Sequence, residues 1–378
     1  MQPFAVVVFI FCSSVVLYVL VGYPLLLAVL ARRERPLRRA WHPLSVTVLL
    51  PVYNGENWIR SKLETIFALD YPHHLLEIIV ISDGSTDGTE AIVQEFVARG
   101  VRLLRVVHGG KALALNAGIA EAHGEILFFT DVRQHLQPDS LRRLVECFDD
   151  PAVGVVSGEL IIREGSSHEE ANIGLYWRHE KWIRERLSRI DSVLGATGAI
   201  YAMRRALAVP LPPGSLLDDM YLPLAAFFRG YRVVLDRSAR AFDFPTALHS
   251  EFGRKVRTLA GNYEILCAFP ALLGPRNRMW LHYVSHKFGR LLIPYALLGA
   301  LLASFWIPYP WNRAAIAAQC AVLALAAVDL LLPQRSAIKR ITSPVRTFIV
   351  MMAASFCAVS FFFTRGRNLW KPTRVRHS

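Results

Sequence analysis

Aspartates stand at three places in the chain where they could bind a metal ion or move a proton. Asp83 and Asp131 each follow directly after an apolar run, and the adjacent pair Asp218 and Asp219 precedes a helical pattern. A divalent cation prefers hard oxygen ligands such as carboxylates, and a carboxylate within hydrogen-bond reach can take the proton of an attacking hydroxyl. Each residue alone is equally typical of a turn or a helix cap. The case for chemistry therefore depends on what surrounds them.

Two further stretches suit a negatively charged ligand. Gly109, Gly110 and Lys111 precede a helical pattern, and the amides of a helix start together with a lysine suit a diphosphate. The segment Arg254–Thr258, with the sequence RKVRT, supplies cations that would offset the charge of a departing nucleoside diphosphate. The alternatives are a capped surface helix for the first stretch and a lipid-facing basic patch for the second.

Polar loops follow the first two predicted strands. Pro51–Glu56 has the sequence PVYNGE and Ser82–Thr89 has the sequence SDGSTDGT, so both combine polar side chains with flexible backbone. Ordinary turn formation explains each loop by itself. Together they would line one edge of a sheet, where a nucleoside could lie.

The elements that must position these residues alternate between strands and helices, which predicts βαβ units and an α/β fold with a mostly parallel sheet. The predicted strands cover residues 46–52, 77–82, 101–107, 125–130 and 153–158, and a short strand covers 199–203. The predicted helices cover residues 57–69, 89–99, 111–122, 140–148 and 167–189. Ligands bind at the carboxyl ends of such strands. Asp83 and Asp131 fall at that edge.

Long apolar runs at both ends of the chain indicate a membrane protein with a globular middle. Hydrophobic residues make up 53% of the 378 residues and charged residues 19%. Phe4–Leu30 carries no charge and exceeds the roughly 20 residues that span a bilayer. A signal peptide is the alternative, but no positive segment precedes the run and no convincing small-residue cleavage site closes it. The arginines that follow predict an outside N-terminus and a cytosolic domain; they are Arg32, Arg33, Arg35, Arg38 and Arg39.

The C-terminal part leaves its membrane topology open. Residues 250–287 are amphipathic and basic, which is typical of a segment in the headgroup layer, and apolar runs follow at 291–307, 314–332 and 345–363. Three crossings that start from the cytosol would leave the basic tail outside, against the charge rule. Either one run is re-entrant or interfacial, or the tail is an exception. The predicted layout is a transmembrane helix at 1–31, a basic linker at 32–44, the α/β domain at 45–245, an amphipathic interfacial region at 246–288, three apolar membrane segments at 289–365 and a basic tail at 366–378.

The net charge of +13 does not indicate nucleic-acid binding, because many basic residues border apolar runs, where they contact anionic headgroups. Those after the last run are Arg365, Arg367, Lys371, Arg374 and Arg376. The cysteines form no C-x-x-C pair, so neither a disulfide framework nor a zinc site is predicted. They are Cys12, Cys147, Cys267, Cys320 and Cys357.

The polar stretches, in this order, resemble the inverting family 2 glycosyltransferases of GT-A fold, whose sheet is Rossmann-like and mostly parallel. The narrower resemblance is to the membrane-bound synthases of cellulose, hyaluronan and poly-N-acetylglucosamine. It covers about residues 45–262 through motifs. The resemblance implies that the nucleoside is held by Pro51, Tyr53, Asn54, Glu56 and Asp83.

The remaining motifs of that family fall on the charged residues. The stretch from Gly110 to Asn116 is similar to Gly-Lys-x-x-Ala-Leu-Asn, which places Lys111 near the donor. The D-x-D metal motif falls on Asp131-Val132-Arg133 with only its first aspartate, so Mg²⁺ or Mn²⁺ would be held by Asp131, donor phosphates and water. The catalytic acidic pair resembles Asp218-Asp219, with Asp219 as the base.

The basic segment departs from its counterpart in the family. The motif Q-x-x-R-W resembles Arg254–Thr258, so Arg257 is the matching donor-binding arginine and Arg254 stands in place of glutamine. Thr258 replaces the tryptophan that stacks on the acceptor sugar in polysaccharide synthases. This loss puts a long-chain polymer acceptor in doubt.

The resemblance implies a membrane enzyme, an inverting glycosyltransferase (hexosyltransferase type) with its catalytic domain on the cytosolic side of a multi-pass chain in the cell (inner) membrane. The donor would be a nucleotide sugar, for which the resemblance suggests a UDP-sugar, and the acceptor a membrane-associated glycan in polysaccharide synthesis. The alternatives are transfer of one sugar to a lipid, such as a polyprenyl phosphate or glycolipid, and a non-catalytic scaffold or transporter subunit. Partner subunits or an oligomer are compatible with either enzyme, and no nucleic-acid partner is expected.

Overall fold

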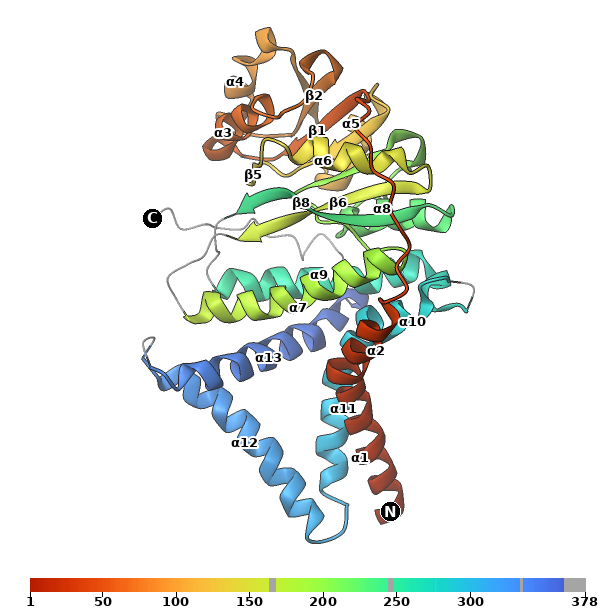
Figure 1. Cartoon of the computed structure of the whole chain (residues 1–378). Helices are drawn as coiled ribbons and strands as arrows, with labels where there is room; N and C mark the ends of the chain where they lie inside the picture. Colours follow the sequence, from red (N-terminus) through yellow and green to blue (C-terminus); the bar gives the residue numbers. More distant parts are fainter. Residues whose placement is uncertain (163–167, 244–247, 276, 334–335, 364–378) are drawn as a thin grey trace. The chain divides into compact units, whose positions relative to one another are not determined.

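The computed structural model describes residues 1–162, 168–243, 248–275, 277–333 and 336–363. Contacts divide the chain into two compact units (Figure 1). The sheet unit comprises Arg33–Arg163 and Leu187–Phe244, and the helical unit comprises Met1–Arg32, Glu164–Arg186 and Pro245–Ser378. Residues 164–186, which the sequence assigns to the α/β domain, thus group with the helical unit.

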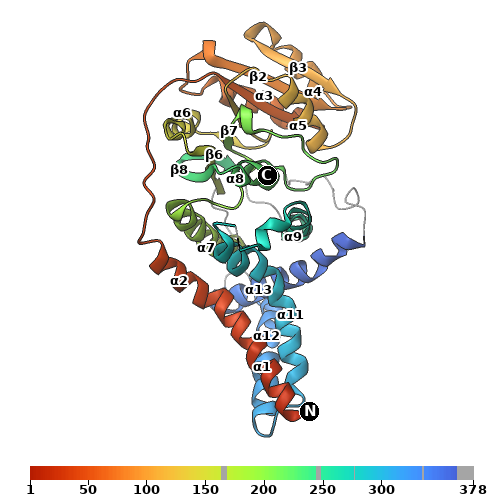
Figure 2. The same ribbon diagram turned by 90° about the vertical axis from the view of Figure 1, so that its right-hand side faces the viewer.

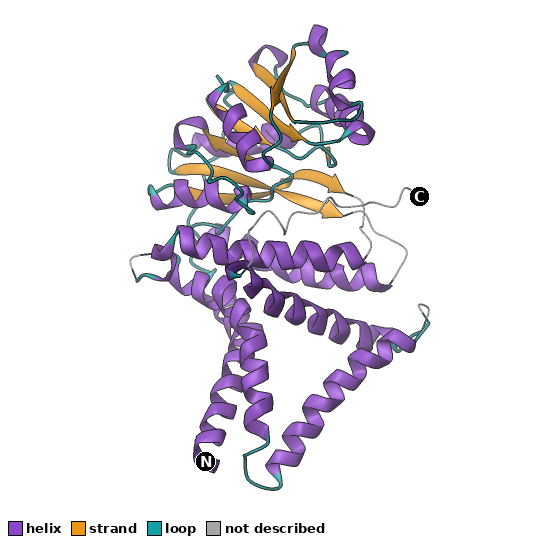
Figure 3. Ribbon diagram, turned by 180° about the vertical axis from the view of Figure 1, so that it is seen from behind, coloured by secondary structure: helices purple, strands orange, loops and turns teal. Residues whose placement is uncertain are grey.

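The sheet unit is built on an eight-stranded sheet within the described residues, with the order β3-β2-β1-β4-β7-β6-β8-β5. Figure 3 draws these strands in orange. Strands β3, β2, β1 and β4 are parallel, β7 runs antiparallel to both of its neighbours, and β6 and β8 are parallel. The strands are β1 (Val46–Val52), β2 (Leu76–Asp83), β3 (Val101–Val106), β4 (Ile126–Phe129), β5 (His135–Leu136), β6 (Val153–Ile162), β7 (Tyr201–Arg204) and β8 (Arg232–Asp243). The predicted mostly parallel α/β sheet is confirmed.

The register brings the polar strand ends together. Val46 pairs with Leu76 on one side and with Ile126 on the other, so β1, β2 and β4 point in one direction. Parallel strands in a central sheet are buried on both faces and are rich in β-branched residues, as in the β1 sequence VTVLLPV. The residues that follow these strands therefore share one edge of the sheet.

Short helices cover the sheet, and those that follow β1, β2 and β3 open next to its polar edge. They are α3 (Glu56–Phe67), α4 (Thr89–Gln94), α5 (Lys111–Ala120), α6 (Ser140–Glu146) and α8 (Asp218–Phe228). Helix α5 packs against β1 and β2, where a Cβ at Gly118 would lie 2.9 Å from Ile81 Cδ1. Helix α8 begins at Asp218, and α5 begins at Lys111. Both helices thus start on residues that the sequence singles out.

Strands β5 and β8 were not predicted. The sequence of β8, RVVLDRSARAFD, carries charges that break the apolar pattern of a buried strand. These charges are compensated in the fold. The buried Arg232 guanidinium donates to the backbone carbonyls of Ser188 and Asp191, and Asp236 Oδ2 accepts a hydrogen bond from Arg39 Nη1 at 2.7 Å.

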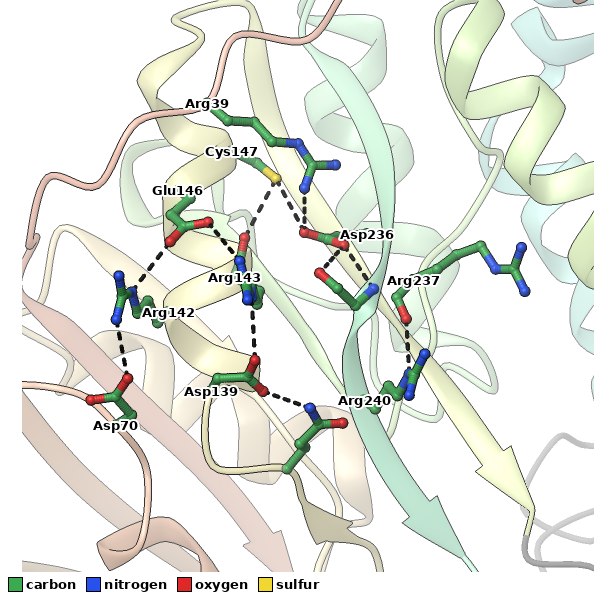
Figure 4. A network of polar contacts seen from close by, with 12 residues as sticks. Arg39, Asp70, Asp139, Arg142, Arg143, Glu146, Cys147, Asp236, Arg237 and Arg240 are labelled. Carbon is green, nitrogen blue, oxygen red and sulfur yellow. Dashed lines mark hydrogen bonds and ion pairs between the residues drawn. The ribbon is translucent and has the colours of Figure 1, made fainter.

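The basic linker is tied to the sheet unit by ion pairs. Arg35 Nη1 lies 2.6 Å from Asp191 Oδ1, and Arg39 pairs with Asp236, which also contacts Cys147 Sγ at 3.8 Å (Figure 4). Aspartates of the sheet unit thus hold two of the arginines that the sequence assigned to the membrane border.

The helical unit holds long apolar helices. Its elements are α1 (Gln2–Leu17), the π-helical η1 (Tyr18–Gly22), α2 (Tyr23–Leu30), α7 (His168–Ile190, whose last turn belongs to the sheet unit), α9 (Leu248–Ala268), α10 (Trp280–His282), the π-helical η7 (Tyr283–Phe288), α11 (Gly289–Ser304), α12 (Trp311–Leu331), α13 (Lys339–Cys357) and the 3-10 helix η8 (Ala358–Phe362). Figure 2 shows α1 alongside α11. Among the described residues, segments long and apolar enough to cross a membrane are Gln2–Leu30, Trp280–Ser304, Trp311–Leu331 and Lys339–Phe362. The basic tail at 366–378 lies outside the described residues.

Candidate active site

Asp83 fixes the glycine turn that opens α5. Its buried carboxylate accepts hydrogen bonds from the amide of Gly109 at 2.8 Å and from the amide of Gly110 at 3.0 Å. Nδ1 of His108 lies 3.0 Å from Asp83 Oδ2. The loop after β2 needs a glycine at position 84 to pass close to this turn, because Gly84 has a φ of +66° and a Cβ there would lie 2.9 Å from His108. Asp83 thus determines where the start of α5 lies.

An aromatic pair flanks this turn. The Tyr53 ring stacks on the His108 ring at a centroid distance of 4.3 Å, and Tyr53 is 39% exposed. Pro51 lies within β1, two residues before Tyr53. The sequence pointed to Tyr53 and Pro51 but not to His108, whose only signal was its place beside the two glycines. The exposed ring presents an apolar, polarizable face at the sheet edge, which suits a nucleobase.

The loops after β1 and β2 are tied to each other. Asn54 has a φ of +50°, and its side-chain oxygen accepts a hydrogen bond from the Thr86 amide at 2.8 Å. Glu56 Oε2 accepts one from the Gly88 amide at 2.7 Å. Asn54 and Glu56 therefore hold the two loops in fixed positions at the polar edge. Their predicted contact with a nucleoside stays a prediction.

Lys111 lies between two carboxylates from different elements. Its ammonium is 2.9 Å from Asp131 Oδ1, just after β4, and 3.2 Å from Asp218 Oδ2, at the start of α8. Burial alone would lower the pKa of Lys111, but the carboxylates of Asp131, Asp218 and Asp219 outweigh it, so the pKa is raised. Lys111 is therefore a permanent cation inside an acidic cluster.

Asp219 is positioned by the glycine-rich turn before β7. Its Oδ2 accepts a hydrogen bond from the Gly198 amide at 3.1 Å, and its backbone oxygen accepts one from the Ala196 amide at 2.7 Å. A Cβ at Gly198 would lie 3.1 Å from Asp219 Oδ2, so a side chain there would crowd the carboxylate. This close approach explains why a glycine occupies position 198.

Tyr201 lies under the acidic cluster and was not predicted. Its ring stacks on Phe129 at 4.4 Å, and its buried hydroxyl has no hydrogen-bond partner within the described part of the chain. Burial first, and then the charges of Asp218, Asp219 and Asp131, raise the pKa of its phenol. The phenol therefore stays protonated close to the cluster and retains an unused donor.

A second unpredicted residue, Lys62 of α3, supports the loop that carries Asp131. Its fully buried ammonium donates to Thr130 Oγ1 at 2.6 Å and to the Gln134 carbonyl at 2.7 Å, so it holds both ends of that loop. Thr130 in turn donates to the Ala199 carbonyl at 2.9 Å, next to Gly198. Burial lowers the pKa of Lys62 to about 7, although Asp131 opposes that shift.

Arg133, which stands where the family's D-x-D motif has its second aspartate, forms an ion pair with Asp243. Arg133 Nη2 lies 2.6 Å from Asp243 Oδ2, which also accepts a hydrogen bond from Gln134 at 2.9 Å. Among the described residues, no cluster of three or more His, Cys, Asp or Glu side chains could hold a metal by itself. The Asp131 carboxylate, 38% exposed, is a hard oxygen ligand that a phosphate-bound cation could reach.

Arg254 and Arg257 lie on α9, in the helical unit. Thr258 Oγ1 donates to the Arg254 carbonyl within that helix at 2.9 Å. Their donor-binding roles stay predictions. The sheet unit by itself brings together Asp131, Asp218 and Asp219 around Lys111, with Asp83 bound to the preceding residue, Gly110.

Comparison with known proteins identifies the family. The profile of "Glycosyl transferase family 2" matches residues 47–209, and that of "Glycosyl transferase family group 2" matches residues 131–333, more than half of the chain. The chain belongs to the family 2 glycosyltransferases. Both matched ranges include Asp131, and the first also includes Asp83 and Lys111. The family resemblance of the sequence motifs is confirmed.

Curated relatives of this family 2 glycosyltransferase carry related names. It is 34% identical over 214 residues to "Glycosyltransferase GlyA" of Streptococcus pneumoniae, covering 52% of this chain and 30% of the relative. It is 26% identical over 242 residues to "Probable glycosyltransferase YdaM" of Bacillus subtilis, covering 60% and 57%. It is 34% identical over 125 residues to "Poly-beta-1,6-N-acetyl-D-glucosamine synthase" of Staphylococcus epidermidis, covering 32% and 30%. The chain thus spans between about a third and just over half of the length of these relatives.

A solved structure shows the same fold over nearly the whole chain. The mannosyltransferase PcManGT from Pyrobaculum calidifontis, in complex with GDP-Man and Mn²⁺, superposes with a TM-score of 0.73 at 24% sequence identity. The match covers 94% of this chain and 99% of that one. The predicted α/β fold with apolar helices at both ends is therefore confirmed for this family 2 glycosyltransferase.

Proposed function

We propose that this chain transfers a sugar from a nucleotide sugar to a membrane-associated acceptor, with inversion at the anomeric carbon. The observation that carries the proposal is the acidic cluster of Asp131, Asp218 and Asp219 around Lys111, at the edge of the sheet where β2 and β4 end. Ligands of open α/β sheets bind at this edge. The family membership supports the same reaction class.

Asp219 is the proposed general base. It takes the proton from the acceptor hydroxyl, that oxygen forms a bond to the anomeric carbon, and the bond from this carbon to the nucleoside diphosphate breaks. Asp218 is the poorer candidate, because its carboxylate is already engaged with the Lys111 ammonium at 3.2 Å. Asp218 instead holds Lys111 in place. A single displacement of this kind inverts the sugar configuration.

Lys111 would stabilise the leaving group of the reaction. A nucleoside diphosphate departs with developing negative charge, and a fixed cation stabilises that charge without reorganising. The amides at the start of α5 suit a phosphate as well, and Asp83 fixes their turn. Tyr53, stacked on His108, would support the nucleobase. Arg257 and Arg254 are the further donor-binding residues that the motif match suggests.

A divalent cation, Mg²⁺ or Mn²⁺, fits the charge of the cluster. Asp131, Asp218 and Asp219 gather there, and their carboxylates would repel a diphosphate unless cations offset their charge. Asp131 would hold the ion together with donor phosphates and water. When bound, the ion would neutralise charge on the phosphates. The PcManGT complex, which contains Mn²⁺, supports this choice.

The acceptor has two candidate classes. The name of the staphylococcal relatives supports a growing glycan, whereas Thr258, in place of the family's acceptor-stacking tryptophan, favours a single transfer to a lipid. The donor is a UDP-sugar by the motif resemblance, and the PcManGT complex adds GDP-mannose as a candidate. We place the sheet unit on the cytosolic face of the cell membrane, because nucleotide sugars are there and the arginines after α2 favour that side.

The test incubates detergent-purified full-length protein and membrane lipid extract with UDP- and GDP-sugars in the presence of Mn²⁺ or Mg²⁺. Released nucleoside diphosphate and the size of the product are measured. One donor should be consumed with metal and spared with EDTA. A ladder of products supports a polymer acceptor, and one new lipid-soluble product supports single transfer. No consumption of any donor by folded protein with lipid extract would contradict the proposed function.

A further inference from the structure

Helix α13 has the length of a membrane span but an unusual distribution of side chains. Together with η8 it covers Lys339–Phe362, which is long and apolar enough to cross a bilayer. Its buried face carries polar and small residues, whereas large apolar side chains point outward. The buried residues are Lys339, Thr342, Ser343, Ala354, Ser355 and Ala358, and the exposed ones include Ile341, Phe356 and Phe362.

The N-terminal end of α13 is fixed to the C-terminal end of α12. Asp329, which is fully buried, accepts hydrogen bonds from Thr342 Oγ1 at 2.6 Å and from Ser343 Oγ at 2.7 Å. Arg346 Nη1 lies 3.2 Å and Lys339 Nζ 3.8 Å from Asp329 Oδ2. These charged contacts place the start of α13 on the same side of the bilayer as the end of α12.

The C-terminal end of α13 is fixed to α9. The Phe362 ring contacts the Tyr263 ring of α9 at a centroid distance of 5.4 Å, and α13 packs along α9. Helix α9 is not among the candidate spans, and it carries Arg254, Lys255, Arg257 and Glu264. A helix with this charge lies outside the hydrocarbon layer. The end of α13 therefore lies on the same side as α9.

Counting crossings shows that these two sides are the same. The arginines after α2 indicate the cytosol, and within the described residues no candidate span lies between α2 and α9, so α9 is cytosolic. The span that ends in α11 then leads outward, and α12 leads back. Asp329, near the end of α12, is thus cytosolic as well. Both ends of α13 are held on the cytosolic side, and α13 cannot cross.

The arrangement in the helical unit agrees with this count. Helix α13 lies crosswise to α11 and α12 in two views of the molecule (Figures 1 and 3). The connection between α11 and α12 carries exposed aromatic residues of the kind that gather at a membrane surface; they are Phe305, Trp306, Tyr309 and Trp311. Arg313 is the one basic residue in or just after that connection, whereas Lys339, Arg340 and Arg346 lie at the start of α13.

We propose that α13 is an interfacial helix that lies in the cytosolic leaflet, so that the chain crosses the bilayer three times. The outward face of α13, with Ile341 and Phe356, is apolar and enters the acyl boundary of that leaflet, while Arg340 contacts anionic headgroups. With both ends of α13 on the cytosolic side, the conflict between the predicted crossings and the charge rule is removed.

The test determines on which side three positions lie in the full-length chain. The native cysteines are replaced by alanine, and single cysteines are introduced by Tyr309→Cys, Ser336→Cys and Ser378→Cys. Spheroplasts are treated with a membrane-impermeant maleimide before and after permeabilisation. Tyr309→Cys should label without permeabilisation, whereas Ser336→Cys and Ser378→Cys should label only after it. Labelling of Ser378→Cys in intact spheroplasts, or protection of Tyr309→Cys in them, would overturn the proposal.

A second measurement avoids the cysteine substitutions. Green fluorescent protein and alkaline phosphatase are each fused after Ser378 of the unmodified chain, because the first folds to its fluorescent form in the cytosol and the second is active only outside it. The fluorescent protein fusion should be bright and the phosphatase fusion inactive. An active phosphatase fusion with a dark fluorescent fusion would show that α13 crosses. Neither readout depends on sugar transfer, so the topology and the proposed function fail or hold separately.

Discussion

Two lysine–carboxylate clusters in this chain differ in their exposure to solvent. In the sheet unit, Lys111 lies among Asp131, Asp218 and Asp219, and the Asp131 carboxylate is 38% exposed. In the helical unit, Asp329 is fully buried and contacts two cations and two hydroxyls. A ligand can therefore reach the first cluster at Asp131, whereas the second is closed. An acidic cluster that stays accessible is a candidate site, whereas a closed cluster serves packing.

The largest expected effect is the loss of turnover when the proposed base of the first cluster, Asp219, is replaced. Asp219→Asn keeps the shape of the side chain but removes the base, so turnover should fall by about 10²–10⁴-fold. Binding of the nucleoside diphosphate, measured by calorimetry, should stay within a few-fold of the wild-type value. Turnover near the wild-type rate would remove Asp219 from the mechanism.

The matching change in the closed cluster should affect stability instead. Asp329→Asn leaves the buried Lys339 ammonium without its carboxylate, and removing one partner of a buried pair costs about 3–5 kcal/mol. Thermal unfolding in detergent should therefore occur at a lower temperature. The turnover of the protein that stays folded should be unchanged. A large loss of turnover with unchanged stability would show that this cluster is not simply structural.

Asp131→Asn should raise the metal concentration needed for activity. Residues that only support metal ligands change affinity or activity by about 10–100-fold, and a direct ligand should have at least that effect. The measurement is the Mn²⁺ dependence of turnover, with Asp329→Asn as the matched control. An unchanged Mn²⁺ dependence would exclude Asp131 as a ligand. Metal removal by EDTA should stop the wild-type enzyme, and added Mn²⁺ should restore it.

The smallest expected effect concerns Lys62, and it depends on pH. Burial lowers the pKa of Lys62 to about 7 from its ordinary value of 10.5, so between these values the unfolded chain binds more protons than the folded chain. The stability of the folded state therefore rises with pH in this window. Lys62→Met lacks the titrating amine, so the advantage of the wild type over this variant should grow from pH 6.5 to pH 9.5. Thermal unfolding at both values measures it, and a constant difference would contradict the buried amine.

The regular half of the sheet could be predicted from the sequence, and its irregular half could not. Strand β1 was predicted with its observed bounds, because Val46–Val52 is apolar except for Thr47. Strand β8 was missed because its charges are neutralised by residues far away in the chain, such as Arg39 for Asp236. Sequence periodicity reports the local pattern only, and a compensation between distant residues leaves no local signal.

The residues of the candidate site also fall into those that the local sequence pattern predicts and those that it does not. Asp131, Lys111 and Asp219 could be found because they stand at strand or helix ends. Lys62 sits within a helical pattern, where a lysine ordinarily indicates a solvated face, and Tyr201 lies within a short buried strand. Only the packed fold shows that Lys62 is enclosed and that Tyr201 lies beneath the carboxylates. The membrane topology was open for the same reason, because the proposed topology rests on contacts of α13 with α9 and α12.

In the proposed reaction, one carboxylate base at the sheet edge deprotonates the acceptor for a single displacement. The most direct test is the anomeric configuration of the product, read by proton NMR after transfer from a donor of known configuration. An α-linked nucleotide sugar should give a β-linked product. A product that retains the α configuration would contradict the account.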